Sequence, residues 1–402
     1  MKIANFGVEE WLNKWEKKAV YDIAQSSIEA LTLDELVGLD GTSVSEFFEK
    51  RKNEPLDYGW IEGSDVFKQE VASLYQTVNP ENILQTNGAT GANLLALYAL
   101  VEAGDHVVSM LPTYQQLYDI PKSLGAAVDF VHLKEEEDWQ FDLEQLEALV
   151  KPETKIICLN SANNPTGTLL DRKTLEKIAE IARTVDAYVL IDEVYAPLTD
   201  KGEFLSIVDV YEKGIATNSL SKTYSIPGIR IGWTATGPEL AEVFRKYRDY
   251  TMICGGVLSD DLAVHALKNK EKILERNKKI ITENLVILKQ WVANEPKVEL
   301  VAPNYVSTSF IKLAIEEDDQ TFCINLLEET GVLLVPGSAF DLPKHARLGY
   351  CCKKETLEKG LFLLSEFLKK PGLNKNTART VCDNCSSSVF HLRLLSMRRR
   401  VP

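Results

Sequence analysis

Ser219-Leu220-Ser221-Lys222, followed by Ile226-Pro227-Gly228-Ile229-Arg230-Ile231-Gly232-Trp233, places a lysine next to hydroxyl groups and eight residues before an arginine. A lysine amine can hold an aldehyde covalently, and an arginine with neighbouring hydroxyl groups can bind a phosphate dianion. The alternative is a surface lysine in a polar turn, because Ser-X-Ser-Lys is a short pattern. Together with Arg230, the pattern indicates a site for pyridoxal phosphate.

Two polar motifs upstream each follow a short apolar run of strand length. Asn163-Asn164-Pro165-Thr166-Gly167 follows the run at 156–159, and Asp192-Glu193-Val194-Tyr195 ends the run that starts at Tyr188. Open α/β sheets bind ligands just beyond the carboxyl ends of their strands. We therefore expect both motifs to contribute to a ligand site.

The order of these motifs carries a resemblance to a known family. Asn-Pro-Thr-Gly, Asp-X-X-Tyr, Ser-X-Ser-Lys and Pro-Gly-X-Arg follow one another as they do in the class I/II aminotransferases. These are fold type I enzymes of the aspartate aminotransferase superfamily. The resemblance implies a pyridoxal 5'-phosphate-dependent transaminase that moves an amino group from an amino acid to a 2-oxo acid, in amino acid metabolism.

Length and composition agree with a globular enzyme. The 402 residues suffice for two domains, and 45% hydrophobic with 26% charged residues excludes disorder of the whole chain. The net charge of −14 makes bulk attraction to nucleic acid or to an anionic membrane unexpected. We expect small-molecule partners instead.

The sequence also bears on the compartment. No apolar stretch has the length needed to cross a bilayer, and the first ten residues contain no apolar secretion core, so we expect a cytoplasmic protein. The seven cysteines have no regular spacing and do not resemble a disulfide framework. We expect most of them to be reduced.

From about residue 60 to 270, short apolar runs alternate with amphipathic stretches. This alternation predicts an α/β fold, with a large domain at 45–280 built on a mostly parallel sheet covered by helices. The predicted strands are 83–84, 106–108, 156–159, 188–191, 215–217 and 231–234, and helical patterns include 92–101 and 175–185.

A smaller α+β unit is predicted after a long helix at 271–292. Its strands are expected at 298–301, 307–313, 332–335 and 347–351, and its helices near 320–330 and 355–369. The resemblance implies that the amphipathic start of the chain, 9–18, joins this unit. The small domain would then be discontinuous and comprise residues 1–44 and 281–370.

The last residues, 371–402, break this pattern because they are basic and lack a consistent apolar face. We expect a disordered extension without a catalytic role. Cys382 and Cys385 could form half of a zinc site, but no second pair of suitable spacing follows, and His391 does not supply one. No metal site is predicted.

Lys222 is the central catalytic candidate. It would form an aldimine with the cofactor aldehyde and then move a proton between the substrate Cα and the cofactor. This requires a neutral amine, so burial and nearby positive charge must lower its pKa.

Asp192 suits the carboxylate that pairs with the pyridine nitrogen, although an Asp at a strand end is often a helix N-cap. The resemblance adds Tyr195 and Asn164 as hydrogen-bond partners of the ring 3-hydroxyl oxygen, and Tyr195 is also a catalytic candidate.

A phosphate site is predicted where Gly88-Ala89-Thr90-Gly91 opens a helix. Backbone amides at a helix start bind anions readily, and the Thr90 hydroxyl adds a donor. Such turns are common, and the motif becomes specific only together with an arginine and further hydroxyl groups. The predicted phosphate ligands are Ala89, Thr90, Ser219, Ser221 and Arg230.

The resemblance assigns roles to three more residues. Tyr114 corresponds to the aromatic residue that stacks on the pyridine ring, although it could equally be a core residue. Tyr58 resembles the tyrosine that reaches the phosphate in the neighbouring subunit, which implies a homodimer with a shared active site. Arg347 matches the arginine that binds the substrate α-carboxylate, together with Asn164; the alternative for Arg347 is a surface ion pair.

One segment departs from the family pattern. Where many relatives have a Gly-Pro-containing segment lining the substrate pocket, this chain has Asp22-Ile23-Ala24-Gln25-Ser26-Ser27-Ile28-Glu29. The segment is faintly similar to that of capreomycidine-synthase-like enzymes, and the donor and acceptor stay open. A lyase, such as a C-S lyase, or a cyclising enzyme on the same cofactor site is the alternative activity. A regulator on this fold is not expected, because no DNA-binding domain precedes the first helix.

Overall fold

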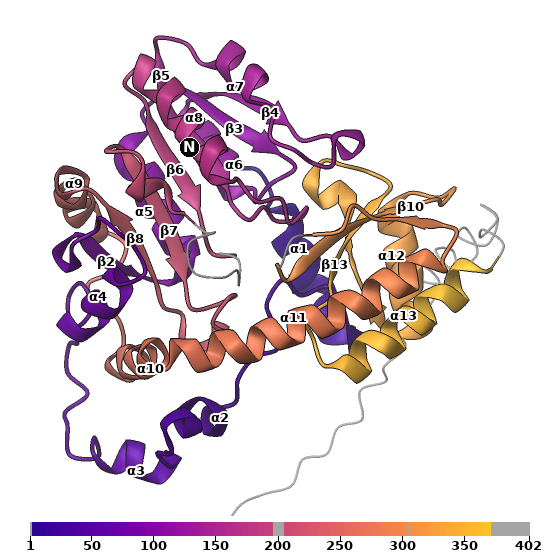
Figure 1. Ribbon diagram of the computed structural model, residues 1–402, viewed down its shortest axis with the longest axis horizontal. Coiled ribbons are helices and arrows are strands. Elements are labelled where there is room, and N and C mark those ends of the chain that lie inside the picture. Colours follow the sequence, from indigo (N-terminus) through magenta and orange to yellow (C-terminus); the bar gives the residue numbers. More distant parts are fainter. Residues whose placement is uncertain (1, 196–204, 304–305, 371–402) are drawn as a thin grey trace, which may run out of the picture.

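The computed structural model of the chain describes residues 2–195, 205–303 and 306–370 (Figure 1). The predicted extension at 371–402, with Cys382 and Cys385, lies outside the described residues. No helix in the described ranges is both long enough and apolar enough to span a membrane.

A seven-stranded sheet forms the larger part of the structure (Figure 1). The strand order is β2-β8-β7-β6-β5-β3-β4, and only β8 runs antiparallel to its neighbours. The strands are β2 (Ile83–Thr86), β3 (His106–Leu111), β4 (Ala127–His132), β5 (Thr154–Asn160), β6 (Tyr188–Asp192), β7 (Gly214–Ser219) and β8 (Gly232–Thr236). The predicted α/β class with a mostly parallel, covered sheet is confirmed.

The central strands are buried on both faces of the sheet, which explains why β3, β5 and β6 contain apolar runs and not alternating patterns. Successive residues of one strand point to opposite faces. In β5, Ile156 and Cys158 belong to one core cluster, whereas Ile157 and Leu159 belong to another. Helices cover both clusters: α4 (Asp65–Ala72), α5 (Gly88–Leu100), α6 (Gln116–Leu124), α7 (Leu143–Leu149), α8 (Arg172–Thr184), α9 (Pro238–Arg248) and α10 (Val257–Lys268).

A smaller antiparallel sheet with the order β12-β13-β10-β9 follows in the C-terminal part. Its elements are β9 (Val298–Glu299), β10 (Thr308–Leu313), α12 (Asp319–Thr330), β12 (Val335–Pro336), β13 (His345–Gly349) and α13 (Lys354–Leu368). The two helices pack on each other beside this sheet (Figure 1). The predicted α+β unit is therefore present.

The N-terminal segment packs against this smaller unit. In α1 (Gly7–Trp15), the indole Nε1 of Trp11 donates a 2.8 Å hydrogen bond to the carbonyl oxygen of Leu334. Further along, β1 (Tyr21–Asp22) pairs in parallel with β11 (Val332–Leu333). Two short helices, α2 (Leu33–Val37) and α3 (Val44–Glu49), then lead to the large sheet. The exact domain boundaries stay a prediction.

The long helix α11 (Lys270–Ala293) runs from α10 to the smaller sheet (Figure 1). The amide of Asn277 donates to the carbonyl oxygen of Thr223 (2.8 Å) and to Oγ of Ser225 (2.9 Å). The amide of Asn284 donates to the carbonyl oxygens of Tyr350 and Cys352, each at 2.8 Å. The helix therefore contacts the segment after Lys222 and the segment after β13.

The structure differs from the strands predicted from the sequence in the following places. The strand β4 was not predicted. It lies at the edge of the sheet and is only partly buried, so its sequence, Ala-Val-Asp-Phe-Val-His, mixes apolar and polar residues. The predicted strand at 332–335 is divided into β11 and β12, which pair with different partners.

Candidate active site

A cavity of about 650 Å³ lies at the carboxyl ends of the central strands, next to the smaller sheet. Its volume is in the range of pockets that enclose a whole ligand. Every site residue predicted from the sequence except Tyr58 lines it: Ala89, Thr90, Tyr114, Asn164, Asp192, Tyr195, Ser219, Ser221, Lys222, Arg230 and Arg347.

The Lys222 amine lies at one end of a short hydrogen-bond chain whose middle member is Ser26. Nζ donates to Oγ of Ser26 at 3.0 Å, and the Tyr195 hydroxyl donates to the same oxygen at 2.9 Å. Burial lowers the pKa of Lys222 to about 8, and the positive charges of Arg347 and Arg230 act in the same direction. Near neutral pH, the neutral amine is therefore far more populated than in an ordinary lysine, and the neutral form is what a nucleophile or a proton acceptor requires.

Asp192 is buried at the end of β6. Its Oδ2 accepts a 2.7 Å hydrogen bond from the amide of Asn93, and its Oδ1 accepts one from the backbone N–H of Val194 at 3.1 Å. Burial raises its pKa to about 6, although both hydrogen bonds oppose that shift. A protonated ring nitrogen would supply the positive charge that such a buried carboxylate lacks.

Asn93 and Thr217 complete this arrangement and were missed from the sequence. The Thr217 hydroxyl donates a 2.6 Å hydrogen bond to Oδ1 of Asn93, which fixes the amide with its N–H groups toward Asp192. Both residues are fully buried. The available signal was an asparagine inside the otherwise apolar helix α5, since buried polar side chains need partners.

We expect Asn93→Ala to lower kcat/KM about tenfold or more, because a lost hydrogen bond to a buried charge costs about 1–3 kcal/mol. Thr217→Val should have a smaller effect in the same direction, since it removes only the group that orients Asn93. The pH at which the absorbance of the bound cofactor changes should also shift, because Asn93 stabilises the charged form of Asp192. An unchanged pH profile and wild-type kcat/KM in Asn93→Ala would contradict this role.

The first turn of α5, where the sequence predicts the phosphate site, lies beside Arg230. Asn87, its N-cap residue, makes no capping hydrogen bond with its side chain, so that side chain does not occupy the N–H groups of the first turn. Gly88 has φ +70°, and a Cβ there would lie 2.6 Å from Nη2 of Arg230. A Cβ on Gly232 would lie 2.4 Å from the carbonyl carbon of Gly88. Both glycines therefore allow the guanidinium and β8 to approach the helix start, and Nη1 of Arg230 also reaches Oγ of Ser221 at 3.4 Å.

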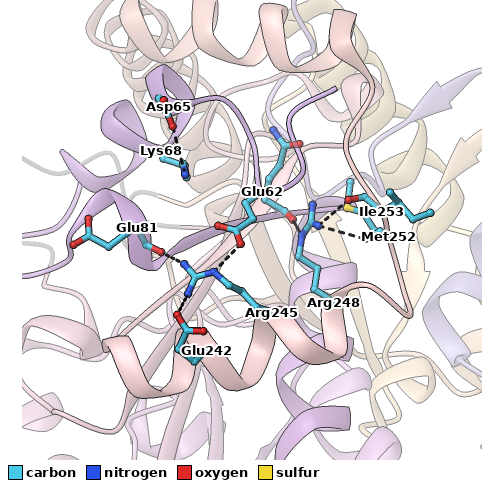
Figure 2. A network of polar contacts seen from close by, with 10 residues as sticks. Glu62, Asp65, Lys68, Glu81, Glu242, Arg245, Arg248, Met252 and Ile253 are labelled. Atoms are coloured by element: carbon cyan, nitrogen blue, oxygen red, sulfur yellow. Dashed lines mark hydrogen bonds and ion pairs between the residues drawn. The ribbon is translucent and has the colours of Figure 1, made fainter. Parts of the chain in front are cut away.

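The loop at 252–256 borders Arg230 and is held by a network around α9 (Figure 2). The buried guanidinium of Arg248 donates through Nε to the carbonyl oxygen of Gln85 (2.8 Å) and through Nη1 to those of Met252 (3.3 Å) and Ile253 (3.1 Å). In Figure 2, Arg245 contacts Glu62, the carbonyl oxygen of Glu81 and Glu242. These contacts fix α9 and the loop relative to β2, and so support the part of the molecule next to Arg230.

Arg347 lies on β13 and is 2% exposed. Its Nε and Nη2 donate to the carbonyl oxygen of Ala24 at 3.2 and 2.9 Å, and Nη1 donates to Oδ1 of Asn164 at 3.3 Å. Burial lowers its pKa, but a guanidinium stays charged at neutral pH. It is therefore a buried, positioned cation, and the surface ion pair considered above does not form.

Two aromatic candidates differ in position. The ring of Tyr114 lines the cavity, and its hydroxyl donates to Oε1 of Glu9 at 3.3 Å. Tyr58 is 78% exposed and lies in a separate shallow depression with residues 254–259. It does not reach the cavity of its own chain.

A family model described as aminotransferase class I and II matches residues 5–362 of this sequence. The chain belongs to the class I and II aminotransferases. An aspartate aminotransferase of Thermotoga maritima is 32% identical over 299 residues, covering 72% of this chain and 76% of that protein. A capreomycidine synthase of Streptomyces vinaceus is 26% identical over 367 residues, covering 90% of this chain and 93% of that protein. The crystal structure of a PLP-dependent aminotransferase from Streptococcus suis 89-1591 has 56% sequence identity and a TM-score of 0.90, covering 93% of this chain and 100% of that chain.

In this class I and II aminotransferase, Glu193 is a second buried carboxyl next to Asp192. Its Oε1 accepts from the Ser206 hydroxyl (2.8 Å) and from the backbone N–H of Ile207 (3.1 Å). Its Oε2 is buried and has no hydrogen-bond partner within the described residues. Burial raises its pKa to about 8, so we expect a protonated side chain at neutral pH.

Because the folded state keeps this proton up to about pH 8 while the unfolded chain loses it near 4.5, stability should fall as the pH rises through that window. Glu193→Gln, which mimics the protonated form, should remove part of this loss, on the order of a few kcal/mol. Urea unfolding at pH 5 and pH 8 measures it. Glu153→Gln, on the surface, is the control and should leave the pH dependence unchanged. An identical slope in Glu193→Gln and wild type would contradict a buried, protonated Glu193.

Proposed function

We propose that Lys222, Asp192, Arg230 and Arg347 carry the reaction of this pyridoxal phosphate-dependent aminotransferase. The observation that supports these roles is their convergence on one cavity: an amine of lowered pKa, a buried carboxylate, an anion site at a helix start and a buried guanidinium. The enzyme moves an amino group from an amino acid to a 2-oxo acid.

The residues present fit the cofactor. The Lys222 amine suits its aldehyde, the Asp192 carboxylate suits its pyridine nitrogen, and the first turn of α5 with Ser219, Ser221 and Arg230 suits its phosphate. When bound, pyridoxal phosphate supplies an electron sink for the electron pair left at the substrate Cα.

The side chains would act on the substrate as follows. Arg347 holds the α-carboxylate through its planar fork, with Asn164 beside it. Lys222 Nζ would take the proton from the substrate Cα and deliver it to the cofactor. Ser26 Oγ, which accepts hydrogen bonds from both Lys222 and Tyr195, keeps the amine aligned between these positions.

A cyclising or eliminating enzyme on the same site is the second candidate. The likeness to a capreomycidine synthase over 90% of this chain favours it. The fate of the substrate carbanion depends on pocket residues and not on the cofactor motifs, so the same side chains serve either reaction.

We also propose a homodimer with a shared active site. Six exposed apolar or aromatic side chains lie in the segments between α3 and α4 and between α9 and α10: Leu56, Tyr58, Trp60, Ile61, Tyr250 and Ile253. Apolar surfaces of this kind mark protein contacts. The depression around Tyr58 shares residues 254–256 and Ser259 with the one beside Arg230, so a second copy covering this surface could place its Tyr58 near the phosphate site. Sedimentation equilibrium would give the mass of the assembly.

We further propose that the enzyme is cytoplasmic and that it has the large and small domains predicted from the sequence.

The test of the activity uses the purified enzyme loaded with cofactor, a panel of amino acids and a 2-oxo acid acceptor. Formation of a new amino acid from the acceptor, with the donor converted to its 2-oxo acid, supports transfer. Release of ammonia without an acceptor supports elimination, and an isomeric or dehydrated product that keeps its nitrogen supports cyclisation.

A further inference from the structure

The outer wall of the cavity is formed by the N-terminal helix α1 and its flanks. The residues on this wall are Phe6, Val8, Glu9, Leu12, Asn13 and Glu16. The helix start is fixed, because the backbone N–H of Gly7 donates to Oε1 of Gln115 at 2.8 Å. The indole of Trp11 fixes the helix to the smaller sheet. Side chains on this wall therefore have defined positions relative to the catalytic groups.

Glu9 is the carboxylate of this wall that reaches the catalytic centre. Oε1 accepts the 3.3 Å hydrogen bond from Tyr114, whose ring also lines the cavity. The negative charge of Glu9 opposes the lowering of the pKa of both Lys222 and Arg347, which places Glu9 within electrostatic range of the two groups that handle the substrate. Glu9 therefore lines the same cavity as Lys222 and Arg347.

The proposed function gives a partner to every cation of the cavity lining, but not to every carboxylate. The cations are Lys222, Arg230 and Arg347, and the proposed function gives each one a partner in the cofactor or the substrate α-carboxylate. Among the carboxylates of the lining, Asp192 serves the pyridine nitrogen. Glu9 and Glu16 are the carboxylates left for the substrate side chain. A second carboxylate on the substrate would meet these two charges and no remaining cation of this chain's lining.

We infer that this site selects amino acids whose side chain ends in a cation, a guanidinium or an ammonium group, and that the Glu9 carboxylate recognises that cation. The inference rests on the proposed function, because it assumes that Arg347 holds the α-carboxylate. It names a substrate class different from that in the name of the aspartate aminotransferase relative.

Further acidic and amide side chains line the same cavity near Glu9. Oε1 of Glu16 accepts a 2.8 Å hydrogen bond from Nε2 of Gln25, which also donates to Oδ2 of Asp22 at 3.0 Å. The amide side chains of Asn13 and Gln25 also belong to the lining, and each carries an acceptor oxygen. A guanidinium presents five N–H donors and no acceptor, so a wall of carboxylate and amide oxygens matches it.

The test compares L-arginine with L-citrulline, which has nearly the same shape and no charge. Binding to the cofactor-loaded enzyme is measured by titration calorimetry and by the absorbance of the bound cofactor. We expect L-arginine to bind about tenfold or more tightly than L-citrulline, since hydrogen bonds to charged groups contribute about that factor or more. In Glu9→Gln, which keeps an acceptor for Tyr114, the ratio should fall toward one.

Glu10→Gln is the matched control, because it removes the same charge one residue further along α1 from an exposed position that does not line the cavity. The arginine to citrulline ratio should stay at its wild-type value there. Equal binding of the two amino acids by wild type, tighter binding of L-aspartate, or an equal loss for both ligands in Glu9→Gln would overturn the inference. Transfer from neutral donors with no charge preference would leave the proposed function standing, whereas a charge preference without any amino transfer would count against the proposed function alone.

Discussion

Lys222→Ala is expected to lower kcat/KM by at least about 10⁴-fold, because the substitution removes a nucleophile and a general acid–base group at once. The loss should appear in kcat. The Lys222 amine has its pKa lowered to about 8, and no other lysine lines the cavity in the described part of the chain. Steady-state kinetics of amino transfer measure the effect.

Two controls separate lost chemistry from lost structure. A small primary amine added to Lys222→Ala should restore part of the activity, because it can occupy the space of the deleted side chain and accept the proton. Ser26→Ala keeps the amine and removes the oxygen to which both Lys222 and Tyr195 donate, so its loss should be much smaller. A Lys222→Ala enzyme that keeps more than about one hundredth of the wild-type kcat would refute the assignment.

Arg347→Ala is expected to reduce kcat/KM by about 10²- to 10⁴-fold, because two charge-assisted hydrogen bonds to a carboxylate are lost, each contributing about 1.5–3 kcal/mol. The larger part should appear as a higher KM. The effect should be similar for the amino acid and the 2-oxo acid, since both carry the α-carboxylate. Arg347→Lys should recover only a fraction, because an ammonium group cannot present the planar fork.

A substrate without the carboxylate tests this role directly. A primary amine should react equally slowly with wild type and Arg347→Ala, because neither enzyme has a carboxylate to bind. Arg347 also holds the carbonyl oxygen of Ala24, so the melting temperature of each variant must be compared with wild type. A variant of normal stability and unchanged KM for both carboxylate substrates would show that another group binds the carboxylate.

The cofactor end of the site was predictable because its motifs are local. Asn164, Asp192, Ser219 and Lys222 each lie at or just beyond the end of a strand, and parallel strands bring such ends to one edge of the sheet. The apolar runs of the buried strands were visible for the same reason. The edge strand β4 was not, since its sequence lacks a buried run.

The supporting contacts were not predictable because they join distant segments. Ser26 meets Lys222 across 196 residues, Asn93 meets Asp192 across 99, and Tyr114 meets Glu9 across 105. None of these residues belongs to a motif with its partner. The sequence did indicate that the segment around Ser26 departs from the family pattern, but its contact with the catalytic amine depends on how β1 and β11 pair.

The helix α11 gives the two halves of the active site a common rigid spacer. Asn277 and Asn284 are seven residues apart, which in an α-helix places them on one face at a separation of about 10 Å. The Asn277 amide is hydrogen-bonded to the backbone just after Lys222, and the Asn284 amide to the backbone just after the strand that bears Arg347. Helix geometry therefore sets the distance between two backbone anchor points, one just after Lys222 and one just after the strand that bears Arg347.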